Sequence, residues 1–124
     1  MNPSLPRHAV VVGGGTMGAD VAVVLARGGL RVSVVERAAA QRERAGARIA
    51  SELAAELADS GRTPPPAMPA IVEALADVAW HDVGLVVECI VEQLAPKQQL
   101  FAELVRRAPA DALLTSNSSG LPIS

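Results

Sequence analysis

The sequence predicts a single α/β domain over residues 1–124, built on a doubly wound parallel sheet. Three observations support this: short apolar runs alternate with helical patterns, a glycine-rich turn joins the first such pair, and the apolar residues are almost all aliphatic. Half of the residues are hydrophobic, but only 2% are aromatic. A core of Ala, Val, Leu and Ile suits a parallel sheet that is buried on both faces, and the chain is long enough for one such core.

The first half of the chain predicts two strand–helix units. Both predicted strands are short and rich in β-branched residues, and the segments after them carry apolar residues at helical spacing. The pair Gly28-Gly29 ends the first helix as a glycine C-cap, and Ile49, Leu53 and Leu57 mark one face of the second. The elements are a strand over His8–Val12, a helix over Thr16–Arg27, a strand over Arg31–Val35 and a helix over Ala38–Asp59.

A connector separates this half from the second. The three consecutive prolines in Thr63–Pro66 cannot continue a helix and predict an exposed loop. A short helix is expected over Ile71–Ala76, and no edge strand is recognisable between Arg62 and Val83. The remaining elements are a strand over Gly84–Val91, a helix over Pro96–Arg107 whose inner stripe holds Leu100, Phe101, Leu104 and Val105, and a strand over Ala112–Thr115.

The most informative motif is the glycine-rich turn between the first predicted strand and helix. In this context the pattern Gly-x-Gly-x-x-Gly holds a dinucleotide pyrophosphate. Gly13 permits a tight turn, Gly15 lets the backbone approach the phosphates, and Gly18 lets the helix pack closely on the strand. The N–H groups and the positive dipole end of the helix then face the negative charge. The predicted pyrophosphate-binding residues are Gly13, Gly14, Gly15, Thr16, Met17 and Gly18.

Glu36 ends the second predicted strand, 18 positions after Gly18. Dinucleotide-binding folds place an acidic residue there, roughly 20 residues beyond the glycines, to accept hydrogen bonds from the adenosine ribose. Because a carboxylate repels a 2′-phosphate, Glu36 favours NAD over NADP, although Arg37 offers such a phosphate a partner. The alternative is an ordinary strand–helix turn, with Glu36 as a solvated strand end.

Composition excludes several classes of partner. The net charge is −2 and aromatic residues are few, so no nucleic-acid or membrane partner is expected. Cys89 is the only cysteine, which excludes an internal disulfide and fits a reducing compartment. Within an apolar strand it is expected to be a buried core residue. No signal or membrane-spanning segment is recognisable, no metal site is expected, and a cytoplasmic location is predicted.

Three segments, in this order, resemble the amino-terminal NAD-binding domain of 3-hydroxyacyl-CoA dehydrogenases, which has a Rossmann-like fold. The resemblance extends over nearly the whole chain. The second and third segments are more specific than the glycine turn and exclude most other dinucleotide-binding families. The segments are Val11-Val12-Gly13-Gly14-Gly15-Thr16-Met17-Gly18-Ala19, then Val86-Val87-Glu88-Cys89-Ile90-Val91-Glu92-Gln93-Leu94 with Lys97 and Leu100-Phe101 following, and Thr115-Ser116-Asn117-Ser118-Ser119.

The resemblance implies cofactor contacts beyond the glycine turn and Glu36. Glu92 and Lys97 resemble the family's contacts near the nicotinamide half, and Asn117 would lie beside the nicotinamide. Ser119 resembles the serine that contacts both cofactor and substrate and donates a hydrogen bond toward the 3-oxygen of the substrate. NAD is the implied cofactor, and 3-hydroxyacyl-CoA and 3-ketoacyl-CoA are the implied substrates.

The residue types alone leave other interpretations open. Glu88 and Glu92 are equally compatible with solvated charges at a strand end, with Lys97 as a weak surface partner of Glu92. Residues 116–119 are also compatible with a plain polar turn.

The family's catalytic histidine and its acidic partner follow the Asn-x-Ser segment, and this chain ends at Ser124. The family's helical domain, which completes the substrate pocket and usually forms the homodimer, follows as well. His8 and His81 match no family position and are expected to be structural or solvated. We therefore expect NAD(H) binding without dehydrogenase activity. Two other functions stay open: a non-catalytic NAD-binding module, and half of a related dehydrogenase acting on a non-CoA hydroxy acid.

Overall fold

The computed structural model describes residues 7–60, 67–90 and 94–116, with only the backbone described at residues 60 and 94–97. It contains a five-stranded sheet of order β3-β2-β1-β4-β5 in which every pair of neighbours is parallel. The elements are β1 (His8–Val12), α1 (Thr16–Arg27), β2 (Arg31–Val35), α2 (Ala39–Ser60), β3 (Ala70–Val72), β4 (Val83–Glu88), α3 (Leu94–Arg107) and β5 (Leu113–Ser116), with 3-10 turns at Leu75–Asp77 and Trp80–Asp82.

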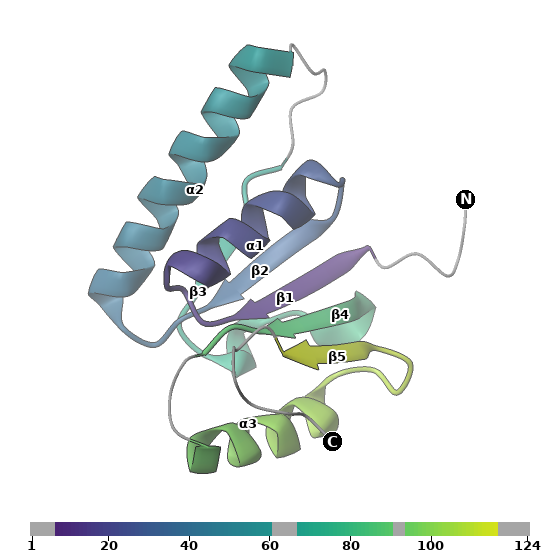
Figure 1. Ribbon diagram of the computed structural model, residues 1–124. Helices are drawn as coiled ribbons and strands as arrows, with labels where there is room; N and C mark the ends of the chain where they lie inside the picture. The colour runs from purple at the N-terminus through teal and green to yellow at the C-terminus, as the bar shows by residue number, and fades with distance from the viewer. Residues whose placement is uncertain (1–6, 61–66, 91–93, 117–124) are drawn as a thin grey trace.

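Helices cover both faces of the sheet. Figure 1 shows α1 and α2 on one face and α3 on the other. The chain enters the sheet at its centre with β1, adds β2 and β3 on one side, and then crosses to add β4 and β5 on the other. The strand order therefore reverses between β1 and β4, as in a doubly wound Rossmann-like sheet. The predicted fold class is confirmed.

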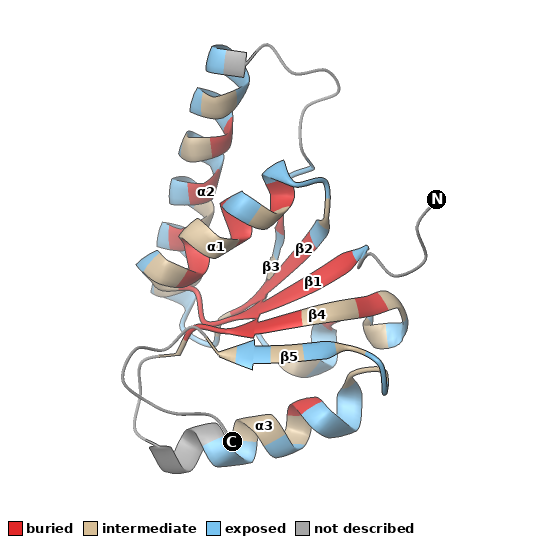
Figure 2. Cartoon of the chain, turned by 45° about the vertical axis from the view of Figure 1, so that its right-hand side comes forward, coloured by how far each residue is buried: buried red, intermediate tan, exposed pale blue. Residues whose placement is uncertain are grey.

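The core lies on both sides of β1, whose five residues are all buried (Figure 2). On the α1–α2 face, Val11 packs in one apolar cluster with Ile49, and on the opposite face Val10 and Val86 pack with Leu104. Ile49 and Leu104 are fully buried. Each such side chain contributes about 1.5–3 kcal/mol to folding. The two layers are mainly aliphatic, and Trp80 and Phe101 pack only partly buried against the second one.

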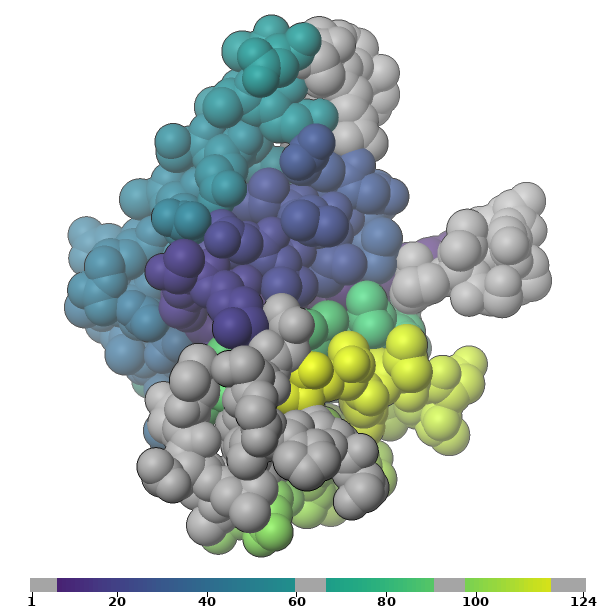
Figure 3. Space-filling model, viewed as in Figure 1, coloured from purple at the N-terminus to yellow at the C-terminus, as the bar shows by residue number. Residues whose placement is uncertain are grey.

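The two helices of the first face lie against each other at the surface, as Figure 3 shows. Arg48 of α2 donates to Asp20 of α1 across a distance of 2.9 Å. Both side chains are nearly half exposed, so this ion pair contributes little beside the apolar packing beneath it. Within the part of the chain that the structure describes, no helix is long and apolar enough to cross a membrane.

The edge strand β3 corrects the sequence prediction. A short helix was expected over Ile71–Ala76, but Ile71 and Val72 pair with Val34 and Val35 of β2, and a single 3-10 turn follows at Leu75–Asp77. A strand of three residues is too short to display a period of two. Its conformation is set by the neighbouring strand, which the local sequence does not reveal.

Several element ends and faces also differ from expectation. β4 ends at Glu88, before the predicted end, and α3 begins at Leu94, so that Pro96 lies within the first turn, where proline is tolerated. Val105 was expected to face inward, but 65% of it is exposed, and Leu57 is 36% exposed at the far end of its stripe. Leu104 alone anchors this part of α3 fully in the core.

A buried polar cluster closes the amino ends of β1 and β2. His8 is 2% exposed, with Nδ1 lying 2.9 Å from Asp82 Oδ1 and Nε2 lying 2.8 Å from Ser33 Oγ. Arg31 donates to the other oxygen of Asp82 at 2.6 Å. Because a carboxylate only accepts, Nδ1 of His8 donates to Asp82, while Nε2 and the Ser33 hydroxyl form the second hydrogen bond of the ring. His8 is therefore structural, as expected, whereas His81 is exposed.

Candidate cofactor site

The glycine turn lies at the carboxyl end of β1, the central strand. Gly13 has a φ of +109°, which disfavours any residue with a side chain, and its N–H donates to Val35 O at 2.8 Å. Gly15 is the N-cap of α1 and has no side chain to cap the helix. The first N–H groups of a helix have no partner within it. The turn therefore presents a helix amino end at the edge of the sheet.

Gly18 and Gly15 differ in whether the surrounding protein leaves room for a side chain. A Cβ on Gly18 would lie 1.8 Å from the carbonyl oxygen of Gly13, so the close contact between α1 and the turn excludes any side chain. At Gly15, with an ordinary extended φ of −73°, a Cβ would meet only the flexible amide of Gln41, at 3.3 Å. The described protein thus has no internal need for glycine at position 15. The space above its backbone fits a group that approaches from outside.

Glu36 follows β2 and turns back toward the glycine turn. Its Oε1 accepts a hydrogen bond from the backbone N–H of Gly14 at 2.8 Å, and its Oε2 accepts one from Ala38 at 3.0 Å. The side chain is half-buried. Because each carboxylate oxygen accepts more than one hydrogen bond, Glu36 retains the capacity to bind a pair of hydroxyl groups.

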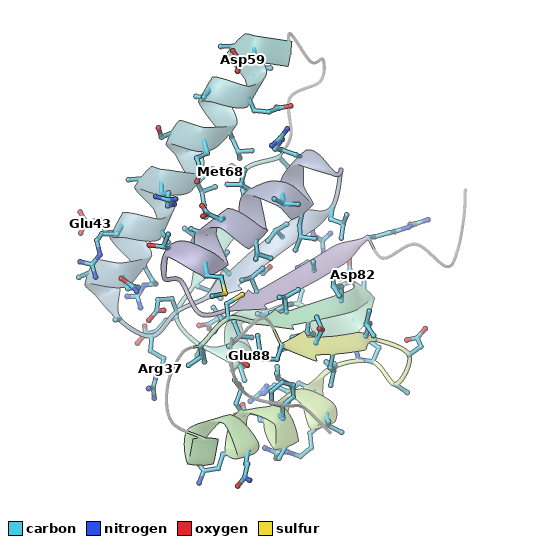
Figure 4. All side chains as sticks on the ribbon, viewed as in Figure 1. Arg37, Glu43, Asp59, Met68, Asp82 and Glu88 are labelled. Carbon is cyan, nitrogen blue, oxygen red and sulfur yellow. The ribbon has the colours of Figure 1, made fainter. Side chains whose placement is uncertain are left out.

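Arg42 on the first turn of α2 fixes the loop that carries Glu36. Its Nη1 donates to the carbonyl oxygens of Glu36 at 3.0 Å and of Arg37 at 2.8 Å. Arg37 itself is exposed beside Glu36 (Figure 4). Glu36, which disfavours a 2′-phosphate, and Arg37, which could bind one, therefore both lie at this loop. The carboxylate is held against the glycine turn, and the guanidinium lies in solvent.

A pocket of about 510 Å³ adjoins this loop at the carboxyl ends of β1 and β2. Its volume lies within the range of small-molecule sites. Aliphatic side chains and charged groups share its wall, including the ion pair of α3 in which Arg107 donates to Glu103 at 2.7 Å. The lining residues are Val12, Gly13, Val35, Glu36, Arg37, Glu73, Ala74, Leu75, Ala76, Ile90, Gln99, Leu100, Glu103 and Arg107.

Glu88 corrects a second expectation. The sequence left open that Glu88 is a solvated charge at the end of a strand, but the residue is fully buried. Its Oε1 accepts from the hydroxyl of Ser116 at 2.7 Å, and its Oε2 accepts from the N–H of Ile90. Cys89, the next residue, is 4% exposed and packs in the apolar core, as predicted.

The structure brings together the predicted adenosine side of the site. Gly13 through Gly18 and Glu36 meet at one edge of the sheet, and Glu36 bonds to the turn directly. Glu92, Asn117 and Ser119 lie outside the described residues, and Lys97 is placed in α3 by its backbone only. Their roles stay predictions. Sequence reasoning missed Ile90 and the charged pair of α3, because which side chains line the pocket depends on the packing of distant elements.

The arrangement fits a dinucleotide in chemical terms. A helix amino end favours phosphate, a carboxylate beside it accepts from ribose hydroxyls, and the adjoining pocket has room for a heterocyclic base. Nothing inside the described protein occupies the space above Gly15 except the amide of Gln41. The residues present thus match an NAD-type cofactor.

Comparisons with known proteins agree with this geometry. Residues 8–124 match the family model of the 3-hydroxyacyl-CoA dehydrogenase, NAD binding domain. A 3-hydroxybutyryl-CoA dehydrogenase of Mycobacterium tuberculosis is 37% identical, with 91% of this chain and 41% of the relative covered. The peroxisomal bifunctional enzyme of Danio rerio is 35% identical, with 98% of this chain and 17% of the relative covered. The chain thus spans less than half the length of these relatives.

Solved structures give the same result. The 3-hydroxybutyryl-CoA dehydrogenase of Escherichia coli superposes with a TM-score of 0.82 at 30% identity, with 96% of this chain and 26% of that chain covered. An NAD⁺-dependent 5-formyl-3-hydroxy-2-methylpyridine 4-carboxylic acid 5-dehydrogenase has a TM-score of 0.80 at 26% identity, with 95% of this chain and 38% of that chain covered. The chain belongs to the 3-hydroxyacyl-CoA dehydrogenase family, as its NAD-binding domain with NAD as the cofactor.

Proposed function

We propose that this domain supplies NAD to the oxidation of 3-hydroxyacyl-CoA to 3-ketoacyl-CoA, a reaction of fatty-acid metabolism. The observation that carries the proposal is Gly15, which the described protein does not need as glycine and which a pyrophosphate does. The family supports the reaction class. A cytoplasmic location, and the homodimer expected for full-length members of the family, stay predictions.

Each described residue of the site has a part in binding. The amino end of α1 holds the pyrophosphate over Gly15, and Glu36 accepts from the ribose. The pocket beside Glu36 receives the adenine. When bound, NAD supplies the acceptor for the hydride that leaves carbon 3. The family resemblance implies that Asn117 would contact the nicotinamide and that Ser119 would orient the oxygen on carbon 3.

The 124 residues by themselves are expected to lack a general base. His8 is buried at the amino ends of the strands, bonded to Asp82 and Ser33, and His81 lies next to this cluster in the 3-10 turn before β4. Both are thus at the opposite end of the sheet from the glycine turn, and neither can take a proton from a bound alcohol.

The test is to mix the purified chain with NADH and a 3-ketoacyl-CoA and to follow the absorbance at about 340 nm. No oxidation of NADH is expected from the 124 residues, whereas a complete 3-hydroxyacyl-CoA dehydrogenase of the family serves as the positive control. Turnover by the chain alone would refute the account, because a base would then be present in this domain.

A second substrate class has an observation in its favour. The 5-dehydrogenase that resembles this chain is named for a pyridine carboxylic acid and not for a CoA thioester. A protein of this family that acts on a non-CoA hydroxy acid would use the same NAD-binding domain. Assaying this domain joined to the helical domain of a family member, with 3-hydroxybutyryl-CoA and with free 3-hydroxybutyrate, separates the two, and we expect the CoA ester to be preferred.

A further inference from the structure

Glu88 joins the carboxyl ends of β4 and β5 from beneath the surface. The residue is fully buried, and its carboxylate accepts from the Ser116 hydroxyl at 2.7 Å and from the Ile90 N–H. Glu88 and Ser116 are register partners, so the first bond links neighbouring strands, while the second closes the turn after β4. A buried carboxylate is costly unless donors satisfy it, and hydrogen bonds to a charged acceptor are the strong ones.

The turn that Glu88 closes lies against the glycine turn. Cys89 N–H donates to Val12 O at 2.8 Å. A Cβ on Gly13 would lie 3.1 Å from the carbonyl group of Cys89 and 3.2 Å from Cγ1 of Ile90. Ile90 also lines the pocket beside Glu36. The bond from Ile90 to Glu88 therefore ties the end of β4 to the glycine turn.

The two strands that Glu88 joins lie on the far side of the reversal in strand order. A dinucleotide spans the carboxyl ends of such a sheet, with one half on each side of the reversal. Glu36 assigns the adenosine half to the β1–β2 side, which leaves β4 and β5 for the nicotinamide half. Ser116 directly precedes the segment predicted to meet the nicotinamide. Figure 4 shows Glu88 beside β5, at the opposite end of β4 from Asp82.

We propose that Glu88 is a positioning residue for the nicotinamide half of the cofactor. It acts through Ser116, by fixing the end of β5 against the end of β4. The inference rests on the proposed NAD-binding function. It assigns Glu88 no contact with the cofactor, which distinguishes it from Glu36.

The experiment compares the affinities of NADH and of ADP-ribose, which lacks the nicotinamide ring. In Ser116→Ala and in Glu88→Gln we expect NADH to bind about five- to tenfold more weakly, and ADP-ribose to change by less than about twofold. Ser116→Thr keeps the hydroxyl and should restore the affinity for NADH. The matched control is Ser33→Ala, which removes a buried hydroxyl bonded to His8 at the other end of the sheet and should change neither affinity.

The remaining outcomes overturn the inference in distinguishable ways. Equal weakening of both ligands in Ser116→Ala would make Glu88 a structural residue only, and an unchanged NADH affinity would deny it any role at the site. If Glu88→Gln does not fold, the Ser116 variants decide the question alone. If the unsubstituted chain binds neither ligand, the proposed function fails and the inference with it.

Discussion

The backbone N–H of Gly14 donates to Oε1 of Glu36 at 2.8 Å, which joins the glycine turn after β1 to the end of β2. A Cβ on Gly14 would lie 2.9 Å from Cβ of Glu36, so the two residues are in direct contact. The two parts of the sequence signal, a glycine motif and an acidic residue after the second strand, are therefore one connected structure. Holding the carboxylate in place before a ligand arrives lowers the ordering cost of binding.

The glycines of the turn should separate folding from binding. Gly18→Ala should destabilise the chain by at least about 3 kcal/mol, because its Cβ would overlap the carbonyl oxygen of Gly13. The free energy of unfolding of Gly15→Val should lie within about 1 kcal/mol of that of the unsubstituted chain, because the backbone there is in an ordinary extended conformation. The same variant should lose NADH binding. Thermal melts followed by circular dichroism, and calorimetric titration, measure the two effects.

The matched control for these variants is Gly28→Ala, at the opposite end of α1. Gly28 has a φ of −77°, and its Cβ would meet nothing closer than a carbonyl oxygen at 3.4 Å. It should change neither stability nor affinity appreciably. A Gly15→Val variant that binds NADH normally would contradict the placement of the pyrophosphate.

Removal of the Glu36 carboxylate should weaken the binding of NADH and reduce the preference for NADH over NADPH. Glu36→Ala should lower the affinity for NADH about ten- to hundredfold, since hydrogen bonds to a charged group contribute about 1.5–3 kcal/mol. The affinity for NADPH should fall by a smaller factor, because its 2′-phosphate no longer meets a negative charge and has Arg37 nearby. Competition binding measures both ligands.

Glu43→Ala is the matched control, because Glu43 is an exposed carboxylate on α2 with its side chain directed into solvent (Figure 4). It should leave both affinities unchanged. If Glu36→Ala weakened NADH and NADPH by the same factor, Glu36 would have no part in choosing between them.

Asp82 should make stability depend on acid pH. Partial burial by itself would raise the pKa of Asp82, but the hydrogen bond from His8 and the charges of His8, Arg31 and His81 outweigh it, so that its pKa is lowered below the ordinary value. A group with a lowered pKa in the folded state stabilises the fold above its unfolded pKa of about 3.9, and this contribution is lost as the pH falls through the folded pKa.

Asp82→Asn should therefore be less stable than the unsubstituted chain at neutral pH, by about 1–3 kcal/mol, since it disturbs the partners of a buried histidine. The difference should shrink as the pH falls below about 4. Urea unfolding at several pH values measures it, with the exposed Asp59→Asn as the control. A difference that stays constant down to the lowest pH would mean that the charge of Asp82 does not stabilise the fold.

Much of the fold was predictable because it is encoded locally. β1, α1 and β2 have the predicted ends, since glycines and a change from apolar runs to helical spacing mark each boundary. β3 was not predictable, because three residues at the edge adopt a strand only through their pairing with β2. The inward prediction for Val105 was wrong because the apolar stripe of α3 is wider than the face that meets the sheet.

The buried polar residues mark the limit of sequence reasoning at the site. A glutamate at the end of a strand is usually solvated, and Glu88 is buried because a donor 28 residues away meets it in the neighbouring strand. The burial of His8 depends in the same way on Asp82, 74 residues away. The place of Glu36 beside the glycine turn was predictable, because it follows from the spacing of Glu36 to glycines that are close in sequence.

The most direct test of the account is calorimetric titration of the folded chain with NADH, in parallel with Gly15→Val. We expect saturable binding at one site by the unsubstituted chain, and no binding by the variant while its circular dichroism spectrum stays unchanged. A folded chain that does not bind NADH, or a variant that binds as well as the unsubstituted chain, would contradict the claim that the glycine turn of β1 and α1 is the cofactor site.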